Sequence, residues 1–395
     1  MQLFLQMGHG MQKMCEELIN KWGKGTVILS PVNMACDKLE SYSKKIHNLG
    51  GEVLFDPQLF FPKGANDKLK LYEYWPDENA TFSTKTTLEI TNEEIFKIND
   101  VINSQKIILP SIQLNESNID KIMQQMIEST VYFREKTNKK ILATIALYPE
   151  SIRSETFVES LINTVSSLDV DGFYIVPQPP NSEYIITDAL WMIGMLKLLT
   201  CLKFTKKEVI VGYSNHQGLI YSLANVDAIA SGNYMNTRAF SPTKFKKVES
   251  AIKQKSTWFY VPNAMCEYKA IQLDVAKQRD ILDLFEPTGV FINDDSSKLF
   301  SGAMPSSTNF TEPNSFRHYL HCLRIQCNEL KEKKYEATFS KYEFLLGAAE
   351  QNIKEIKKSG ITGQNRDFED GIEANRVAMI ACRDDYGLKL SLEWD

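Results

Sequence analysis

Short apolar runs rich in β-branched residues alternate along the chain with longer stretches in which apolar residues recur every three to four positions. Runs of the first kind are typical of buried strands, and stretches of the second kind are typical of amphipathic helices. The predicted strands are Leu3–Met7, Thr26–Leu29, Val53–Phe55, Ile107–Leu109, Ile141–Ala146, Gly172–Val176, Val209–Gly212 and Ala228–Ala230. The predicted helices between them are Met11–Trp22, Asp37–Leu49, Asn118–Thr137, Glu155–Leu168, Thr187–Leu202 and His216–Ala224. Repeated strand–helix units of this kind indicate an α/β fold with a parallel sheet.

Such a sheet is either open and doubly wound or closed into a barrel, because periodicity alone does not distinguish the two. Two observations favour the barrel. About eight strand–helix units fit into roughly 240 residues, the usual size of such barrels. In addition, no Gly-x-Gly-x-x-Gly loop follows the first strand, as it often does in an open nucleotide-binding sheet. We therefore expect a (β/α)8 TIM barrel with a C-terminal helical extension.

The predicted barrel occupies residues 1–310, and the predicted helical extension occupies residues 311–395 and packs on it. A long connection at about residues 60–103 interrupts the barrel, and a connection of that length is more often functional than decorative. It contains Tyr72, Tyr74 and Trp75. These rings can stack on a nucleobase, and packing within the loop is the other explanation for them.

The charge balance restricts how the chain can bind nucleic acid. It has 395 residues, with 45 Lys and Arg against 50 Asp and Glu, and its formal net charge is −5. This balance argues against a protein that holds nucleic acid by bulk positive charge. A local basic surface is still compatible with it. The run Lys244-Phe245-Lys246-Lys247 can either contact a phosphate backbone or form a solvated helix face.

The seven cysteines are scattered and never spaced Cys-x-x-Cys. Without a secretory leader, this pattern predicts reduced thiols and a cytoplasmic protein. No window reaches the ~18 uninterrupted apolar residues of a membrane span, so no membrane association is expected.

Chemistry in a barrel of this type takes place at the C-terminal ends of the strands. There the sequence has amides, hydroxyls and prolines but few charges, a lining that suits a neutral polar heterocycle or a sugar better than a di-metal hydrolase centre. The side chains able to transfer protons or hold charge are His9, Asp56, Glu150, His216 and Arg238. The predicted substrate-binding residues are His9, Gln58, Gln178, Tyr213, Asn215, Asn233, Asn236 and Arg238.

Asp56 and His216 are the predicted catalytic residues. Asp56 follows the apolar Val53–Phe55, so its carboxylate is held against the core and can act as a base or nucleophile. It can also be a turn residue before Pro57. His216 can act as an acid or base, or be a plain polar residue in the first turn of the next helix. Arg238 can clamp a phosphate or carboxylate, or form a surface salt bridge.

Six short segments between about residues 45 and 325 share one resemblance. They are Val53-Leu54-Phe55-Asp56, Asp171-Gly172-Phe173-Tyr174-Ile175, Val211-Gly212-Tyr213-Ser214-Asn215-His216-Gln217, Val226-Asp227-Ala228, Met235-Asn236-Thr237-Arg238 and Phe316-Arg317-His318-Tyr319-Leu320. In this order along the chain they resemble segments of tRNA-guanine transglycosylases and of their relatives that insert 7-deazaguanines into DNA. The main points of similarity are the Leu-Thr-Asp that opens the family's Asp-Ser-Gly-Gly-Phe motif, its Gly-Val-Gly turn and its Met-Pro-Thr-Arg tetrad. The family's Ser-Gly-Gly-Phe is replaced here by Pro57-Gln58-Leu59-Phe60.

This resemblance implies a barrel that recognises a purine-type base in RNA or DNA and cleaves or exchanges its N-glycosidic bond. It implies that Asp56 acts as base or nucleophile and that Arg238 binds phosphate. It also implies that the amides of Gln178, Asn215 and Asn233 recognise the base.

The chain departs from the family at the nucleophile. Ala230 and Ser231 stand where the family has its nucleophilic aspartate, and no carboxylate lies between Asp227 and Arg238. Asp56 is therefore the first candidate for that role as well.

The family's Cys-x-Cys-x-x-Cys zinc cluster is also absent. Cys266 lies near Glu267 and Cys322 near His318, which are too few ligands at metal spacing. We therefore expect no metal and no cofactor, with zinc left as an open question.

The sequence thus predicts a transglycosylase-like enzyme of nucleic-acid modification or antiviral defence. Its expected partners are tRNA or DNA, or a free nucleobase or nucleotide, together with other proteins of a multi-component system. Two alternatives stay open: a catalytically inactive barrel that binds nucleic acid or a partner protein, and a barrel enzyme that acts on a small metabolite.

Overall fold

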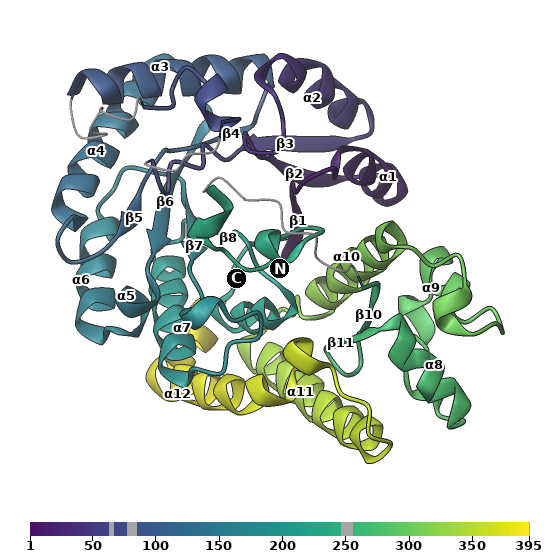
Figure 1. The fold of residues 1–395 in the computed structure, drawn as a ribbon. Coiled ribbons are helices and arrows are strands. Elements are labelled where there is room, and N and C mark those ends of the chain that lie inside the picture. The colour runs from purple at the N-terminus through teal and green to yellow at the C-terminus, as the bar shows by residue number, and fades with distance from the viewer. Residues whose placement is uncertain (63–66, 77–84, 246–255, 395) are drawn as a thin grey trace.

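Eight parallel strands form a nearly closed, barrel-like sheet in the computed structural model, which describes residues 1–62, 67–76, 85–245 and 256–394. The strands are β1 (Gln2–Gln6), β2 (Gly25–Leu29), β3 (Gly51–Phe55), β4 (Lys106–Ile108), β6 (Lys140–Leu147), β7 (Gly172–Pro177), β8 (Glu208–Val211) and β9 (Ala228–Ser231). They follow one another in the order β3-β2-β1-β9-β8-β7-β6-β4, and a short strand β5 (Gln113–Leu114) pairs with β6. The two ends of this path, β3 and β4, lie against each other, so the sheet almost closes (Figure 1). All eight predicted strands are confirmed, as is the mixed α/β class.

The first and last of the eight strands along the chain, β1 and β9, pair with each other inside this path. Leu5 of β1 lies opposite Val27 of β2 on one side and opposite Ser231 of β9 on the other. Burial of strands on both faces produces the continuous apolar runs in the sequence, because the barrel interior and the outer helices each cover one face.

The predicted helices lie around the outside of this sheet (Figure 1). They are α1 (Gln12–Trp22), α2 (Leu39–Asn48), α4 (Ile119–Lys136), α6 (Glu155–Ser166), α7 (Ala189–Phe204) and η4 (His216–Ala224), the last of which is a 3₁₀ helix. The expected start of α7 is confirmed, because the side chain of Asp188 caps it by accepting a hydrogen bond from the Trp191 backbone at 3.1 Å. Gly23 ends α1 in a left-handed conformation, φ 69°.

Several elements were not predicted. The long connection contains α3 (Lys85–Val101), and α5 (Pro149–Arg153) follows β6. An antiparallel hairpin of β10 (Trp258–Val261) and β11 (Cys266–Lys269) precedes α8 (Ala270–Gln278) and α9 (Asp294–Leu299).

Tyr72, Tyr74 and Trp75 are buried in the long connection, and the rings of Tyr72 and Tyr74 pack against Phe55 at the end of β3. The hydroxyl of Tyr72 donates to the Met34 carbonyl and that of Tyr74 to the Pro57 carbonyl, each at 2.9 Å. These rings therefore belong to the packing of the loop, and they do not form an exposed surface for base stacking.

The C-terminal helices α10 (Glu312–Glu329), α11 (Tyr335–Lys358) and α12 (Glu369–Glu393) pack on the barrel. α12 covers the outer side of α7, which explains why α7 is apolar on all its faces. α10 contacts β1 and α1 and so lies in the outer wall of the barrel. Among the described residues, no helix is long and apolar enough to cross a membrane.

A substitution at Gly212, just after β8, tests this packing. A Cβ atom there would lie 2.5 Å from the hydroxyl oxygen of Tyr174, so Gly212→Ala must push the Tyr174 ring aside. We expect a loss of about 1–3 kcal/mol in the free energy of unfolding, measured by urea denaturation. The matched control is Gly347→Ala in α11, where no atom lies within 4 Å and helix propensity should raise stability by about 0.5–1 kcal/mol. Equal effects of the two substitutions would contradict this account.

Candidate functional site

The carboxylate of Asp56 is fully buried at the C-terminal end of β3. Its Oδ2 accepts hydrogen bonds from the hydroxyls of Tyr213 at 2.8 Å and Tyr174 at 3.2 Å, and its Oδ1 accepts one from the Gln58 backbone at 3.0 Å. A buried carboxylate is tolerated only where such donors replace its lost hydration. The prediction that the Asp56 carboxylate is held against the core is therefore confirmed. Its hydrogen bond from the Gln58 backbone also fits the alternative prediction that Asp56 is a turn residue.

Amides complete this Asp56 cluster. Gln58 donates from Nε2 to the Tyr213 hydroxyl at 2.8 Å, and its Oε1 accepts from the Ser30 hydroxyl at 3.0 Å. Tyr174 also contacts Gln6 Oε1 at 3.0 Å, although its one proton can serve only one acceptor at a time. Turning the Gln6 amide would offer a donor to Tyr174 and leave its proton for Asp56.

Two backbone positions in the Asp56 cluster are left-handed although neither is glycine. Gln58 has φ 56° and Tyr213 has φ 53°. Each such conformation costs of order 1–3 kcal/mol and persists only where the surrounding structure enforces it. The strain therefore falls on the two residues whose side chains meet beside the Asp56 carboxylate.

Three phenylalanines, Phe60, Phe240 and Phe245, cover the Asp56 cluster. They pack edge-to-face or tilted on one another, and Phe60 and Phe240 also contact the ring of Tyr213, at centroid distances of 6.3 and 5.4 Å. All three are buried. We call these three residues the aromatic cover; through Phe60 and Phe240 they pack against the Tyr213 ring of the Asp56 cluster.

Arg238, predicted as a phosphate clamp, is instead buried in a second group of charges. Its Nη1 lies 3.2 Å from Glu267 Oε2, and Arg366 Nη1 lies 2.7 Å from the same oxygen. Tyr184 donates to the other carboxylate oxygen at 2.6 Å, and the Arg238 guanidinium lies over the Tyr319 ring at 3.5 Å. Arg238 therefore forms a salt bridge, as the alternative interpretation expected, but this salt bridge is buried and does not lie on the surface.

This Arg238–Glu267–Arg366 triad joins three parts of the chain. Arg238 follows β9, Glu267 is in β11, and Arg366 precedes α12. Despite full burial, the pKa of Glu267 is lowered to about 2 because the two guanidinium groups and Tyr184 stabilise its charge.

His216 lies at the start of η4 beside this triad, and the contacts described for Asp56 do not include it. Its ring is surrounded by Tyr184, Tyr260, Tyr319 and Phe368. Burial lowers its pKa to about 4, with Glu267 acting in the opposite direction, so the ring is neutral at pH 7. As predicted, it falls in the first turn after β8, and its surroundings are those of a packed aromatic residue.

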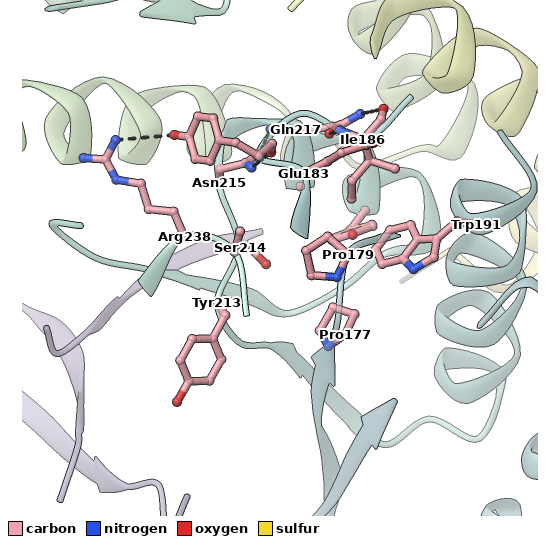
Figure 2. Close-up of a pocket in the computed structure, with 14 residues that line it drawn as sticks. Pro177, Pro179, Glu183, Ile186, Trp191, Tyr213, Ser214, Asn215, Gln217 and Arg238 are labelled. Atoms are coloured by element: carbon pink, nitrogen blue, oxygen red, sulfur yellow. Dashed lines mark hydrogen bonds between the residues drawn. The ribbon is translucent and has the colours of Figure 1, made fainter. Parts of the chain in front are cut away.

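A small cavity lies between the ends of β7 and β8, η4 and the start of α7. It encloses about 30 Å³, room for about two water molecules, and is lined by Pro179, Trp191, Asn215 and Gln217 among others. Figure 2 shows the ring of Tyr213 pointing away from Asn215 and Gln217. The cavity is well below the roughly 300–1,000 Å³ of a small-molecule site, so it does not hold a purine as it stands.

The predicted base-recognising amides are already hydrogen-bonded within the protein. Gln178 accepts from Gln113 at 2.8 Å, and Asn215 donates to the Tyr184 carbonyl at 2.5 Å while capping η4. Asn233 donates to the His9 carbonyl at 2.9 Å. Each of these side chains therefore has a local structural role.

The remaining predicted residues lie elsewhere. His9 and Asn236 are exposed. Of the predicted set, the structure brings together Asp56, Gln58 and Tyr213, whereas Arg238 and His216 form a separate group. Lys246 and Lys247 of the predicted basic run lie outside the described residues.

Sequence reasoning missed Gln6 and Tyr174 in the Asp56 cluster, and Glu267 and Arg366 in the triad. The first two had a usable signal, because each is a polar side chain inside an otherwise apolar strand. The triad had none, since its partners are 29 and 99 residues apart along the chain.

The described residues contain no group of three or more His, Cys, Asp and Glu side chains arranged to hold a metal. Cys322 lies 3.7 Å from the ring nitrogens of His318, but that ring bonds to the Tyr260 carbonyl at 2.8 Å and to Asn293 at 2.9 Å. This histidine is therefore engaged in packing and hydrogen bonding at both nitrogens.

A scan against models of known protein families gives no match, and neither does a search among curated proteins.

Removing the charge of Glu267 tests the triad. Glu267→Gln leaves two buried guanidinium groups with one neutral partner, and we expect the free energy of unfolding to fall by about 3–5 kcal/mol at pH 7. The folded-state pKa of Glu267 lies below its ordinary value of 4.5, so its contribution is present above pH 4.5 and is lost as the pH falls towards 2. The difference between wild type and variant in urea denaturation should therefore shrink over that interval. Glu40→Gln, at an exposed helical pair with Lys44, is the control and should leave the midpoint unchanged.

His216 should also make stability depend on pH. Its folded-state pKa of about 4 is below the ordinary 6.5, so stability is complete above pH 6.5 and is lost as the pH falls towards 4. At 1.36 kcal/mol per pKa unit the loss is about 3 kcal/mol. We expect His216→Phe to remain folded at pH 7.5 and to show a shallower decline of the free energy of unfolding across this range. An unchanged slope would show that His216 is protonated without penalty in the folded state.

Proposed function

We propose that this chain is a (β/α)8 barrel of the TIM type that acts on the N-glycosidic bond of a purine-type base in RNA or DNA, as a divergent relative of the transglycosylases. The observation that supports this best is the Asp56 cluster. It places a buried carboxylate, hydrogen-bonded to a tyrosine hydroxyl, at the C-terminal end of a barrel strand. Enzymes built on such barrels have their catalytic groups at that end.

The surroundings of Asp56 suit proton transfer at a glycosidic bond. The carboxylate accepts hydrogen bonds from two tyrosine hydroxyls and one backbone amide, which orient it at the end of β3. Gln58 and Gln6 provide amides within the same cluster, and they are better placed than Gln178, Asn215 or Asn233 to contact a base beside Asp56.

Substrate entry on this proposal requires the aromatic cover to move. A base that replaced Phe60 and Phe240 would lie against the Tyr213 ring, and stacking on aromatic rings is worth about 1–3 kcal/mol per base. Arg238 is held by Glu267, so phosphate contacts have to come from other cations. With a net charge of −5, binding of nucleic acid should be weak and strongly sensitive to salt.

A second function, a non-catalytic barrel that binds nucleic acid or a partner protein, is favoured by one observation. The aromatic cover seals the Asp56 cluster, and the amides predicted to bind a base are occupied by bonds within the protein. A barrel of this kind would bind through its exposed surface and leave the cluster closed.

Base release distinguishes the two functions. The purified protein is incubated with unfractionated tRNA, duplex DNA and single-stranded DNA, and released or exchanged bases are measured by mass spectrometry. We expect wild type to release base from one of them and Asp56→Asn to do so at least about 100-fold more slowly, because the general base is lost.

Glu150→Gln is the matched control, since Glu150 also follows a barrel strand but is exposed in α5. It should retain the wild-type rate. Binding of nucleic acid without any base release, by wild type and by Asp56→Asn equally, would support the non-catalytic barrel and contradict the enzyme.

A further inference from the structure

The outer helices α3 and α4 form the two sides of a groove on the surface. They lie side by side on the outer side of the sheet (Figure 1), and the groove between them has a volume of about 530 Å³. The hydroxyl of Ser129 in α4 donates to Asn92 Oδ1 in α3 at 3.1 Å and so joins the two helices. The two sides of this α3–α4 groove are therefore held together by contacts within the protein.

Apolar side chains line the α3–α4 groove and stay open to water. Ile127 is 46 % exposed and Val131 is 52 % exposed, and they lie one turn apart on α4. Leu88 of α3 and the ring of Tyr132 complete the apolar lining. In contrast, the apolar outer side of α7 is covered by α12. Exposed apolar side chains that gather in a groove are typical of a surface that binds a partner.

Three glutamates, Glu89, Glu128 and Glu135, also line the groove and are exposed. Among the described residues that line it there is no Lys or Arg. None of the three carboxylates forms a salt bridge with a described residue, whereas the nearby Glu93 is paired with Lys136 at 2.9 Å. The groove therefore has an uncompensated negative charge beside its apolar lining.

These two features distinguish between the possible occupants of the groove. The negative charge repels the phosphates of nucleic acid and the headgroups of anionic lipids. The half-exposed lining cannot enclose most of the surface of a small molecule, as small-molecule sites do. A helix with one apolar and one basic side matches both features, because amphipathic helices lay their apolar side into grooves of this kind.

We propose that the α3–α4 groove binds a basic amphipathic helix of a partner protein. Apolar side chains one turn apart on that helix contact Ile127 and Val131. Glu128 and Glu135 are seven residues apart along α4, a distance of about 10 Å, so they pair with Lys or Arg side chains two turns apart on the partner. This inference goes beyond the glycosidic reaction and does not depend on it, because the groove lies on the outer side of the sheet.

The test measures binding of a synthetic peptide to the full chain by fluorescence anisotropy. The probe is a labelled Leu/Lys peptide of about 15 residues, with leucines on one side of the helix and lysines on the other. A second probe has glutamate in place of every lysine. We expect wild type to bind the Leu/Lys peptide at least about tenfold more tightly than the Leu/Glu peptide, and we expect this preference to decrease at high salt.

Two pairs of substitutions locate the binding. Ile127→Ser with Val131→Ser should weaken binding of the Leu/Lys peptide by at least about tenfold, because the apolar contact is lost. Glu128→Gln with Glu135→Gln should weaken it by about threefold to tenfold, because two ion pairs are lost. All four side chains are exposed, so both variants should remain folded, which circular dichroism and urea denaturation check.

The matched control lies on α12. Ile380 and Leu388 are also apolar and exposed there, at 46 % and 79 %, with Asp384 between them along the helix. Ile380→Ser with Leu388→Ser should therefore retain the wild-type affinity for the Leu/Lys peptide.

Three results would overturn the inference. The first is equal binding of the two peptides by wild type, and the second is equal loss of affinity in the α12 control and in the groove variants. The third is self-association of the chain alone, measured by analytical ultracentrifugation and abolished by Ile127→Ser with Val131→Ser, because the occupant is then a second copy of this chain. None of these results affects the proposed function, which base release tests separately.

Discussion

Burial of the Asp56 carboxylate determines how the side chains and the backbone are arranged around it at the C-terminal ends of the strands. A charge removed from water must be compensated by donors, and the hydroxyls of Tyr213 and Tyr174 and the Gln58 backbone provide them. Meeting this demand requires two left-handed backbone positions, at Gln58 and Tyr213. It also requires a residue without a side chain at Gly212, where the Tyr174 hydroxyl passes close to the backbone.

A second buried charge holds the rest of the chain against the barrel. Glu267 accepts from Arg238 after β9 and from Arg366 before α12, so the hairpin, the eight-stranded sheet and the C-terminal helices are joined at one carboxylate. Because the triad has two positive groups for one negative group, it is favourable only in this well-bonded geometry. His216 stays neutral beside it, since a further positive charge there would be opposed by burial and by both arginines.

The strands could be predicted from the sequence because a strand that is buried on both faces consists of a continuous run of apolar residues. All eight strands end within about two residues of their predicted ends. Asp56, Gln58 and Tyr213 were candidate site residues because each of them follows a predicted strand. The hydrogen-bond partners of Asn215, Asn233 and Arg238 could not be predicted from the sequence, because these partners lie in distant segments such as β11. The helix α3 was missed although Leu88, Ile95 and Ile98 form a buried stripe along it, and the exposed apolar residues Ile90 and Val101 blur that stripe in the sequence.

Burying the Asp56 cluster costs folding free energy, and this cost is relevant to whether the barrel-like sheet has only a structural role. The interior of a barrel of this kind is ordinarily filled by layers of branched apolar side chains, and replacing a buried charge by well-packed apolar groups is often neutral or stabilising. This chain instead holds a carboxylate, two tyrosine hydroxyls and two strained residues beneath a cover of phenylalanines. Strain of this kind clusters at active sites, where it is part of the mechanism. On the proposed function, the aromatic cover over this cluster is the resting state of a site that opens.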